Sequence, residues 1–259
     1  MKIEWVIMKA RNAVAVIPTM DVDSQRVRLL VNELDHAGVD SLLVEDRLPE
    51  FSFSRSMNRG IEQALGRNPK PDIIILSNDD IFDIKGLDDM MEYVHINGGY
   101  AQPYVNGKRC SFVVTRSRIG YIFRYAVKRL APFYALRHIR LFHARIGSNY
   151  PAPAILHGKH EIVCVQPFGV FKSESLETVK FNEEIVNGME DDQFGYSLHV
   201  IHGFRGVTKR EWNVHHSRGS SFRGKTRRMK ASIYGSDEQF RRNFFIFDAT
   251  VRMWKNRRT

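Results

Sequence analysis

Residues 72–83, DIIILSNDDIFD, decide the predicted fold class. Four apolar residues at 73–76 run directly into the polar sequence Ser-Asn-Asp-Asp at 77–80. A short apolar run bounded by turn residues is typical of a buried strand. In an open α/β sheet, ligands bind at the carboxyl ends of the parallel strands, which is where these polar residues would lie. The stretch therefore predicts an α/β domain with an acidic site at one edge of its sheet.

The surrounding sequence alternates strand and helix patterns. Strands are predicted at 12–18, 41–46 and 71–80, and the helices between and after them at about 24–37, 54–66 and 87–94. Asp23 or Ser24 is suited to cap the first helix, and Gly38 and Gly66 are suited to end the first two. Strands separated by helices predict right-handed crossovers, a mostly parallel sheet and helices on both of its faces.

The later part of the chain is less regular. Residues 116–145 are basic and aromatic without acidic residues, and Pro132 divides them into two predicted helices. A strand-rich stretch at 161–173, a helix at about 192–202 and a strand at 205–216 follow, and a basic C-terminal helix carries Phe240, Phe244 and Trp254. We expect one domain over 1–221, which includes a helical insertion at 116–150, and a helical extension over 222–259.

The net charge of +10 and the pI near 9.7 favour anionic partners such as nucleic acid, anionic lipid or phosphate-bearing ligands. No apolar run reaches the length of a spanning helix, and charged residues interrupt the N-terminal apolar segment, which predicts a cytoplasmic protein. The basic stretch 116–145 has three interpretations: a peripheral hairpin on the anionic inner face of a membrane, a nucleic-acid surface, or a helical lid that packs its aromatic residues inside.

Acidic residues and histidines recur at predicted element ends. Asn78 and Asp80 would share one face of an extended chain, with Asp79 turned away, and such oxygen ligands suit Mg²⁺ or Mn²⁺. Each acidic group taken alone is equally typical of a turn or a helix cap. The remaining members of the set are Glu45, Asp46, Glu190, Asp191, Asp192, His215 and His216.

The order of these motifs resembles family 2 glycosyltransferases of the GT-A fold. The likeness is carried, over residues 13–221, by AVAVIPTM, LLVED, FSFSRSMNRGIEQA, IIILSNDD, FGVFKSESLETVKFNEEI, GMEDDQFGYSLHVIHGFRG and WNVHHSRGSS. It points to the rhamnosyl- and galactosyltransferase-like branch, whose metal motif begins with Asn. The resemblance implies a Rossmann-like sheet, Mn²⁺ or Mg²⁺ as cofactor, and inverting transfer of a sugar from a nucleotide-diphosphate sugar. The implied acceptor is a hydroxyl of a glycan, a lipid-linked saccharide or a protein; a hydroxylated base of DNA is the alternative.

The resemblance also implies residue roles. Asp80 would bind the metal, with His215 or His216 beside it. Asp191 would be the catalytic base, with Glu190 and Asp192 as further candidates, since Gln193 stands where the family has its second Asp. The implied nucleotide-binding residues are Pro18, Thr19, Asp46, Arg55, Asn58, Asn78 and Asp79.

Two other functions compete with this interpretation. A nucleotidyltransferase also uses carboxylates at strand ends, but the sequence IPTMDVDS after the first strand lacks the glycine-rich phosphate loop expected of one. The second alternative is a basic protein that binds nucleic acid or membranes and carries a vestigial site.

Overall fold

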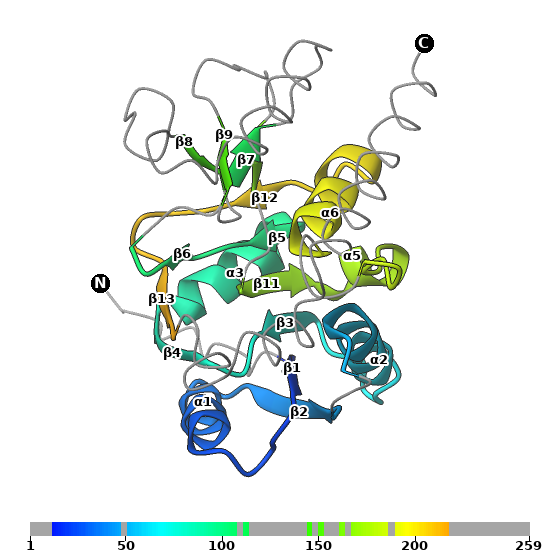
Figure 1. Ribbon diagram of the computed structural model, residues 1–259, viewed down its shortest axis with the longest axis vertical. Coiled ribbons are helices and arrows are strands. Elements are labelled where there is room, and N and C mark those ends of the chain that lie inside the picture. The colour runs from blue at the N-terminus through cyan, green and yellow to red at the C-terminus, as the bar shows by residue number, and fades with distance from the viewer. Residues whose placement is uncertain are drawn as a thin grey trace, which may run out of the picture.

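The computed structural model describes residues 12–47, 51–107, 111–113, 144–146, 150–152, 161–163, 167–185 and 190–217. Its centre is a six-stranded mixed sheet (Figure 1). In spatial order the strands are β12 (Gly206–Val207), β5 (Tyr100–Ala101), β11 (Phe168–Lys172), β3 (Ile73–Ser77), β1 (Ala13–Thr19) and β2 (Asp40–Glu45). Three of the five pairings are parallel, and the two pairings of β11 are antiparallel. The predicted mostly parallel α/β sheet is confirmed.

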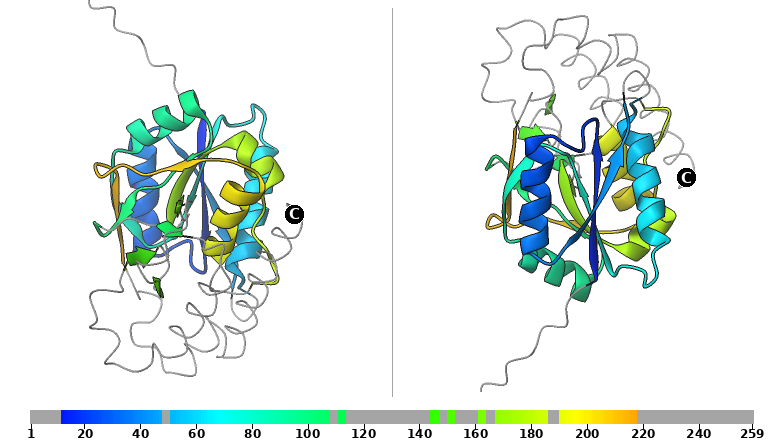
Figure 2. Two further views of the ribbon diagram at one scale, coloured as in Figure 1. Left: turned by 90° about the horizontal axis from the view of Figure 1, so that it is seen from above. Right: turned by 90° about the horizontal axis from the view of Figure 1, so that it is seen from below.

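Helices cover both faces of this sheet, as predicted. On one face lie α1 (Gln25–His36) and α3 (Leu87–Asn97); on the other lie α2 (Phe53–Leu65), α5 (Ser173–Thr178) and α6 (Glu190–Tyr196). In both views of Figure 2, α1 and α2 flank the sheet on opposite sides, and α6 (yellow) lies on the side of α2. The chain continues from α6 into a π-helical turn, η3 (Ser197–Ile201). Among the described residues, no helix combines the length and apolarity needed to cross a membrane.

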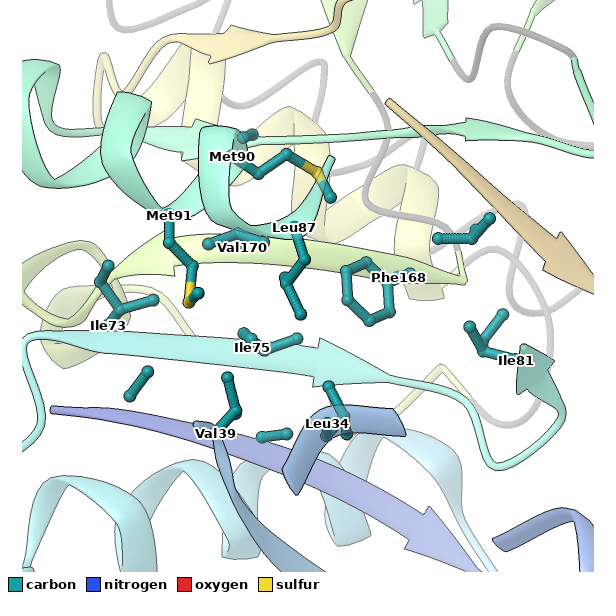
Figure 3. Packing of buried hydrophobic residues seen from close by; sticks show 14 of the residues in the cluster. Leu34, Val39, Ile73, Ile75, Ile81, Leu87, Met90, Met91, Phe168 and Val170 are labelled. Carbon is teal, nitrogen blue, oxygen red and sulfur yellow. The ribbon is translucent and has the colours of Figure 1, made fainter. Parts of the chain in front are cut away.

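The central strands are apolar throughout because both of their faces are buried. Every residue of β1 and β3 is buried, and alternate side chains enter two separate clusters. Figure 3 shows one cluster, in which Ile73 and Ile75 of β3 face Leu87 and Met91 of α3. Such double burial is the physical reason for the unbroken apolar run that the sequence shows at 73–76.

A second sheet stands beside the first and carries part of the candidate site. It consists of β4 (Ile81–Lys85), β13 (Asn213–His216) and β6 (Tyr104–Val105), with β13 in the middle. Two further two-stranded sheets pair β7 (Ser111–Val113) with β10 (Glu161–Val163), and β8 (Ala144–Ile146) with β9 (Tyr150–Ala152).

Several sequence predictions need correction. The strand predicted at 71–80 ends at Ser77, and after a three-residue turn, Asn78 to Asp80, the chain forms β4, which was not predicted. The strand predicted at 205–216 is two strands, β12 and β13, in different sheets. Within the predicted helical insertion 116–150, β8 is a strand because it pairs with β9. The remainder of that insertion and the predicted C-terminal extension 222–259 lie outside the described residues.

Candidate functional site

The turn between β3 and β4 carries the predicted metal motif, and the chain anchors it from two sides. The backbone N–H of Asn78 donates to the carbonyl of Pro167 (2.8 Å), the residue before β11. The carbonyl of Asp80 accepts a hydrogen bond from the N–H of Ser217 (3.0 Å), just after β13. Because β11 is antiparallel to β3, its amino end meets the carboxyl end of β3 at this edge of the sheet. The turn therefore has a defined position.

Asp80 lies against one of the two predicted histidines. His216 Nε2 is 3.0 Å from Asp80 Oδ1, and the two side chains are 23% and 8% exposed. His216 pairs with the buried Ile81, so its side chain lies on the inner face of the β4–β13 ladder. A carboxylate oxygen and an imidazole nitrogen are thus brought together at the carboxyl edge.

The other histidine faces away from Asp80. His215 pairs with Phe82, on which its ring stacks, and its Nδ1 lies 3.1 Å from Asp83 Oδ2. Adjacent residues of a strand project to opposite faces, so only one of the two can approach the turn. The structure places His216 there.

The carboxylate of Asp79 is engaged within the protein. Asp79 Oδ2 accepts hydrogen bonds from Thr19 Oγ1 (2.8 Å) and from an Arg26 guanidinium nitrogen (2.9 Å). Burial raises the pKa of the Asp79 carboxyl; Arg26 and Thr19 oppose that rise, and the neighbouring Asp80 adds to it. Thr19 is 1% exposed. Both residues were predicted to bind the nucleotide, and in the structure their side chains hydrogen-bond to each other. Arg26 was not predicted at all.

The second acidic strand end lies at the same edge of the sheet, on the other side of β1. Asp46 follows β2, and its backbone N–H donates to the carbonyl of Thr19 (3.0 Å), which extends the pairing of β1 with β2 by one residue. Its Oδ2 accepts a hydrogen bond from Ser56 Oγ of α2 (2.8 Å). Pro18 is a buried member of β1 that pairs with Val44. Asp46 and Asp79 therefore follow the strands on either side of β1 and are joined through Thr19 at its end.

The two residues predicted in α2 differ in their surroundings. Arg55 is exposed in the first turn. Asn58 is buried, and its side-chain amide donates to the Phe181 carbonyl and to Glu183 Oε1 (both 2.9 Å) while its oxygen accepts from the Phe181 N–H (2.9 Å). These three bonds join α2 to the segment before α6. Asn58 thus forms a structural link, and its nucleotide contact stays a prediction.

The third acidic group lies at the start of α6. Glu190 and Asp191 are half-buried in its first turn, and the side chain of Asp192 lies outside the described residues. Further along the helix, Phe194 stacks on Phe181 with ring centroids 3.9 Å apart. Phe181 in turn meets Phe53, the first residue of α2, edge to face. The aromatic contacts hold α6 beside the amino-terminal end of α2.

The segment leading to α6 also passes that end of α2. Ser54 Oγ donates to the carbonyl of Ile185 (3.2 Å), and Ser56, two residues later, donates to Asp46. Four residues separate Ile185 from Glu190. Ile185 therefore lies at the amino-terminal end of α2.

The donor atoms at the turn suit a metal ion whose remaining ligands come from a phosphate group. Within the described part of the chain, no three His, Cys, Asp or Glu side chains gather as a metal-binding group. Asp80 and His216 provide one oxygen and one nitrogen. Mg²⁺ is commonly bound by one or two carboxylates together with substrate phosphates and water, and Mn²⁺ also accepts imidazole. The pair fits an ion completed by a diphosphate.

No protein-family model and no curated protein matches the chain in sequence. Its shape is similar to that of several solved structures. The catalytic domain of Drosophila β1,4-galactosyltransferase 7 with xylobiose shares 12% identity at a TM-score of 0.47, covering 85% of this chain and 78% of that one. GalNAc-T7 with UDP, GalNAc and Mn²⁺ shares 10% identity at a TM-score of 0.43, and the match covers 80% of this chain and 44% of that one. A glycosyltransferase involved in glycosylation of the major capsid of PBCV-1 shares 8% identity at a TM-score of 0.37, and the match covers 85% of this chain and 98% of that one.

Proposed function

We propose that this protein is a metal-dependent, inverting glycosyltransferase that moves a sugar from a nucleotide-diphosphate sugar to an acceptor hydroxyl. The observation that carries the proposal is the contact between Asp80 and His216 at the carboxyl edge of the sheet. Asp46 follows β2, two strands from β3, at the same carboxyl edge, where an α/β sheet binds its ligand. The sequence resemblance to family 2 glycosyltransferases gives these positions their proposed roles.

In this proposal Asp80 and His216 hold Mn²⁺ or Mg²⁺. When bound, such an ion neutralises the negative charge that develops on the leaving diphosphate. Asp46 accepts hydrogen bonds from the nucleotide base, and Ser56 holds the carboxylate in place for that contact. Arg55, exposed on the first turn of α2, extends its guanidinium toward a phosphate. Asn78 contributes a side-chain amide at the turn between β3 and β4.

Asp191 is proposed as the base. It takes the proton of the acceptor hydroxyl as the oxygen attacks the anomeric carbon, so that one displacement inverts the configuration. General-base catalysis of this kind typically contributes about 10² to 10⁴ in rate. The contacts of Phe194 and Ser54 support this assignment because they bring the α6 region to the end of α2 whose Ser56 donates to Asp46.

The proposed acceptor is a saccharide hydroxyl, either free or lipid-linked. A lipid-linked acceptor goes with binding of the chain to an anionic membrane surface, and both are tested by the same assay with acceptors presented in solution or in anionic vesicles. Transfer to DNA containing hydroxylated bases, in place of saccharides, would identify the alternative acceptor.

The test uses a panel of nucleotide diphosphates and nucleotide sugars with Mn²⁺. A donor that binds the folded state raises its melting temperature by mass action. Release of nucleotide diphosphate from the selected donor, measured with and without EDTA, then reports the reaction. Three variants are compared with the wild type: Asp80→Asn, Asp191→Asn and, as the matched control, Asp83→Asn.

Asp83 suits the control because it lies three residues from Asp80 but faces His215 on the outer side of the ladder. Its φ of 52° is left-handed, which Asn tolerates well. We expect Asp80→Asn to lose the Mn²⁺-dependent shift and Asp191→Asn to keep the shift but lose about 10²-fold or more in rate. Asp83→Asn keeps both. Wild-type turnover by Asp80→Asn would overturn the proposal.

A further inference from the structure

Asp79, the middle acid of the metal motif, is held by two donors from other parts of the fold. Thr19 at the end of β1 and Arg26 in the first turn of α1 both donate to the same oxygen, Oδ2, at 2.8 and 2.9 Å. The Asp79 side chain is 13% exposed and that of Arg26 is 30% exposed. This ion pair is therefore partly withdrawn from water, where charged hydrogen bonds are stronger than on an open surface.

The position of Asp79 determines what its neighbour can do. Asp79 and Asp80 are adjacent in the three-residue turn; Asp79 contacts Arg26, and Asp80 contacts His216. Rotation of the turn would move both carboxylates together. Since the N–H of Asn78 is already bonded to Pro167, the turn is fixed at its start by the backbone and at its centre by the Asp79 side chain.

Arg26 also balances charge at this turn. Two neighbouring carboxylates repel each other, and each would attract the same cation. The guanidinium of Arg26 and the hydroxyl of Thr19 occupy Asp79 Oδ2, so this oxygen is directed to α1 and β1 while Asp80 Oδ1 is directed to His216.

We propose that Arg26 and Thr19 are positioning residues for the metal site: they clamp Asp79 and thereby orient Asp80 toward His216. This inference rests on the function proposed above and deepens it. Asp79 is then neither a metal ligand nor a nucleotide contact, and Arg26 acts through Asp79 and does not bind phosphate itself.

The test measures Mn²⁺ binding alone, by electron paramagnetic resonance of the free ion during titration of the full chain. The variants are Arg26→Ala, Arg26→Lys and the matched control Arg28→Ala. Arg28 lies on the same helix and pairs with Asp23 at 3.4 Å, but both side chains are largely exposed (67% and 84%). Loss of a group that orients a metal ligand typically costs about 10- to 100-fold in metal affinity, which is the loss expected for Arg26→Ala. Arg26→Lys keeps part of the Mn²⁺ affinity because the positive charge remains. Arg28→Ala binds Mn²⁺ as the wild type does.

Amide hydrogen exchange provides a second measurement that needs no metal. The N–H groups of Asn78 and Ser217 report the two anchors of the turn. Their exchange is expected to accelerate in Arg26→Ala and not in Arg28→Ala. Wild-type Mn²⁺ affinity in Arg26→Ala would overturn the inference, as would an effect confined to UDP binding in EDTA, which would make Arg26 a phosphate ligand. A wild-type chain that binds no Mn²⁺ overturns the proposed function itself, and the clamp of the metal site with it.

Discussion

Gly60 is the point at which α2 approaches the central sheet, and adding one methyl group there gives a direct test of the packing. A Cβ at residue 60 would lie 2.3 Å from Val16 Cγ1 and 2.8 Å from Val44 Cγ2. Favourable carbon–carbon contacts are about 3.5–4.0 Å, so both contacts are severe overlaps. Val16 is fully buried in β1, and a β-branched side chain has little rotamer freedom with which to move aside.

The expected cost follows from two opposing terms. Overpacking a tightly packed core typically costs about 1–3 kcal/mol, while replacing glycine by alanine inside a helix returns about 0.5–1 kcal/mol. Because the overlaps at 2.3 and 2.8 Å are severe, we expect a cost in the upper half of the overpacking range, about 2–2.5 kcal/mol, so Gly60→Ala should lower the free energy of unfolding by about 1–2 kcal/mol. At about 2–4 °C per kcal/mol for a chain near this size, the melting temperature falls by about 2–8 °C.

The measurement is urea and thermal unfolding followed by circular dichroism, with Gly66→Ala as the control. Gly66 ends the same helix at a φ of −79°, which any residue can adopt, and the nearest atom to its added Cβ is 3.3 Å away, so a smaller change is expected. Val16→Ala removes the atom responsible for the 2.3 Å overlap, and Gly60→Ala should cost less on that background. Strict additivity of the two changes, or a Gly60→Ala protein as stable as the wild type, would refute the packing argument.

Two further predictions concern the histidine pair and Asp89 of α3. His216→Ala is expected to weaken Mn²⁺ binding about tenfold or more, whereas His215→Ala changes it little, because only His216 contacts Asp80; equal losses in titrations of the two variants would contradict this assignment. Hydrogen bonds from Lys209 and from the Trp212 indole lower the pKa of Asp89, so its contribution to stability is present above about pH 4 and is lost as the pH falls through the folded-state pKa. Urea unfolding should show the difference in stability between wild type and Asp89→Asn shrinking below about pH 4, and a difference independent of pH would exclude this role.

The sequence predicts those parts of the fold that depend on local pattern. The apolar runs of β1 and β3 identify buried strands, and Gly38, with a φ of 68°, ends the α1 region as predicted. The alternation of strand and helix predicts the parallel pairings around β1. All of these features are decided by residues within a few positions of one another.

Features that depend on distant pairing were not predictable in this way. The direction of β11 follows from the route of the chain, because its apolar residues suit either direction. β4 is five residues long and pairs with β13, more than 120 residues away. The alternation of a strand predicts that His215 and His216 face opposite sides, but only the register of β13 with Ile81 decides which one meets Asp80. Arg26 belongs to no motif, and its role appears only when α1 packs beside the turn.

The reversed polarity of β11 has a practical consequence for altering substrate choice. Its two ends lie at opposite edges: Phe168 pairs with Ser77 beside the acidic turn, whereas Lys172 pairs with Ile73 at the far side. In strands β1 to β3, a library aimed at specificity should diversify positions that follow the strand. For β11 the productive positions are at its beginning, around Pro167, whereas the residues that directly follow Lys172, at the start of α5, lie at the opposite edge of the sheet.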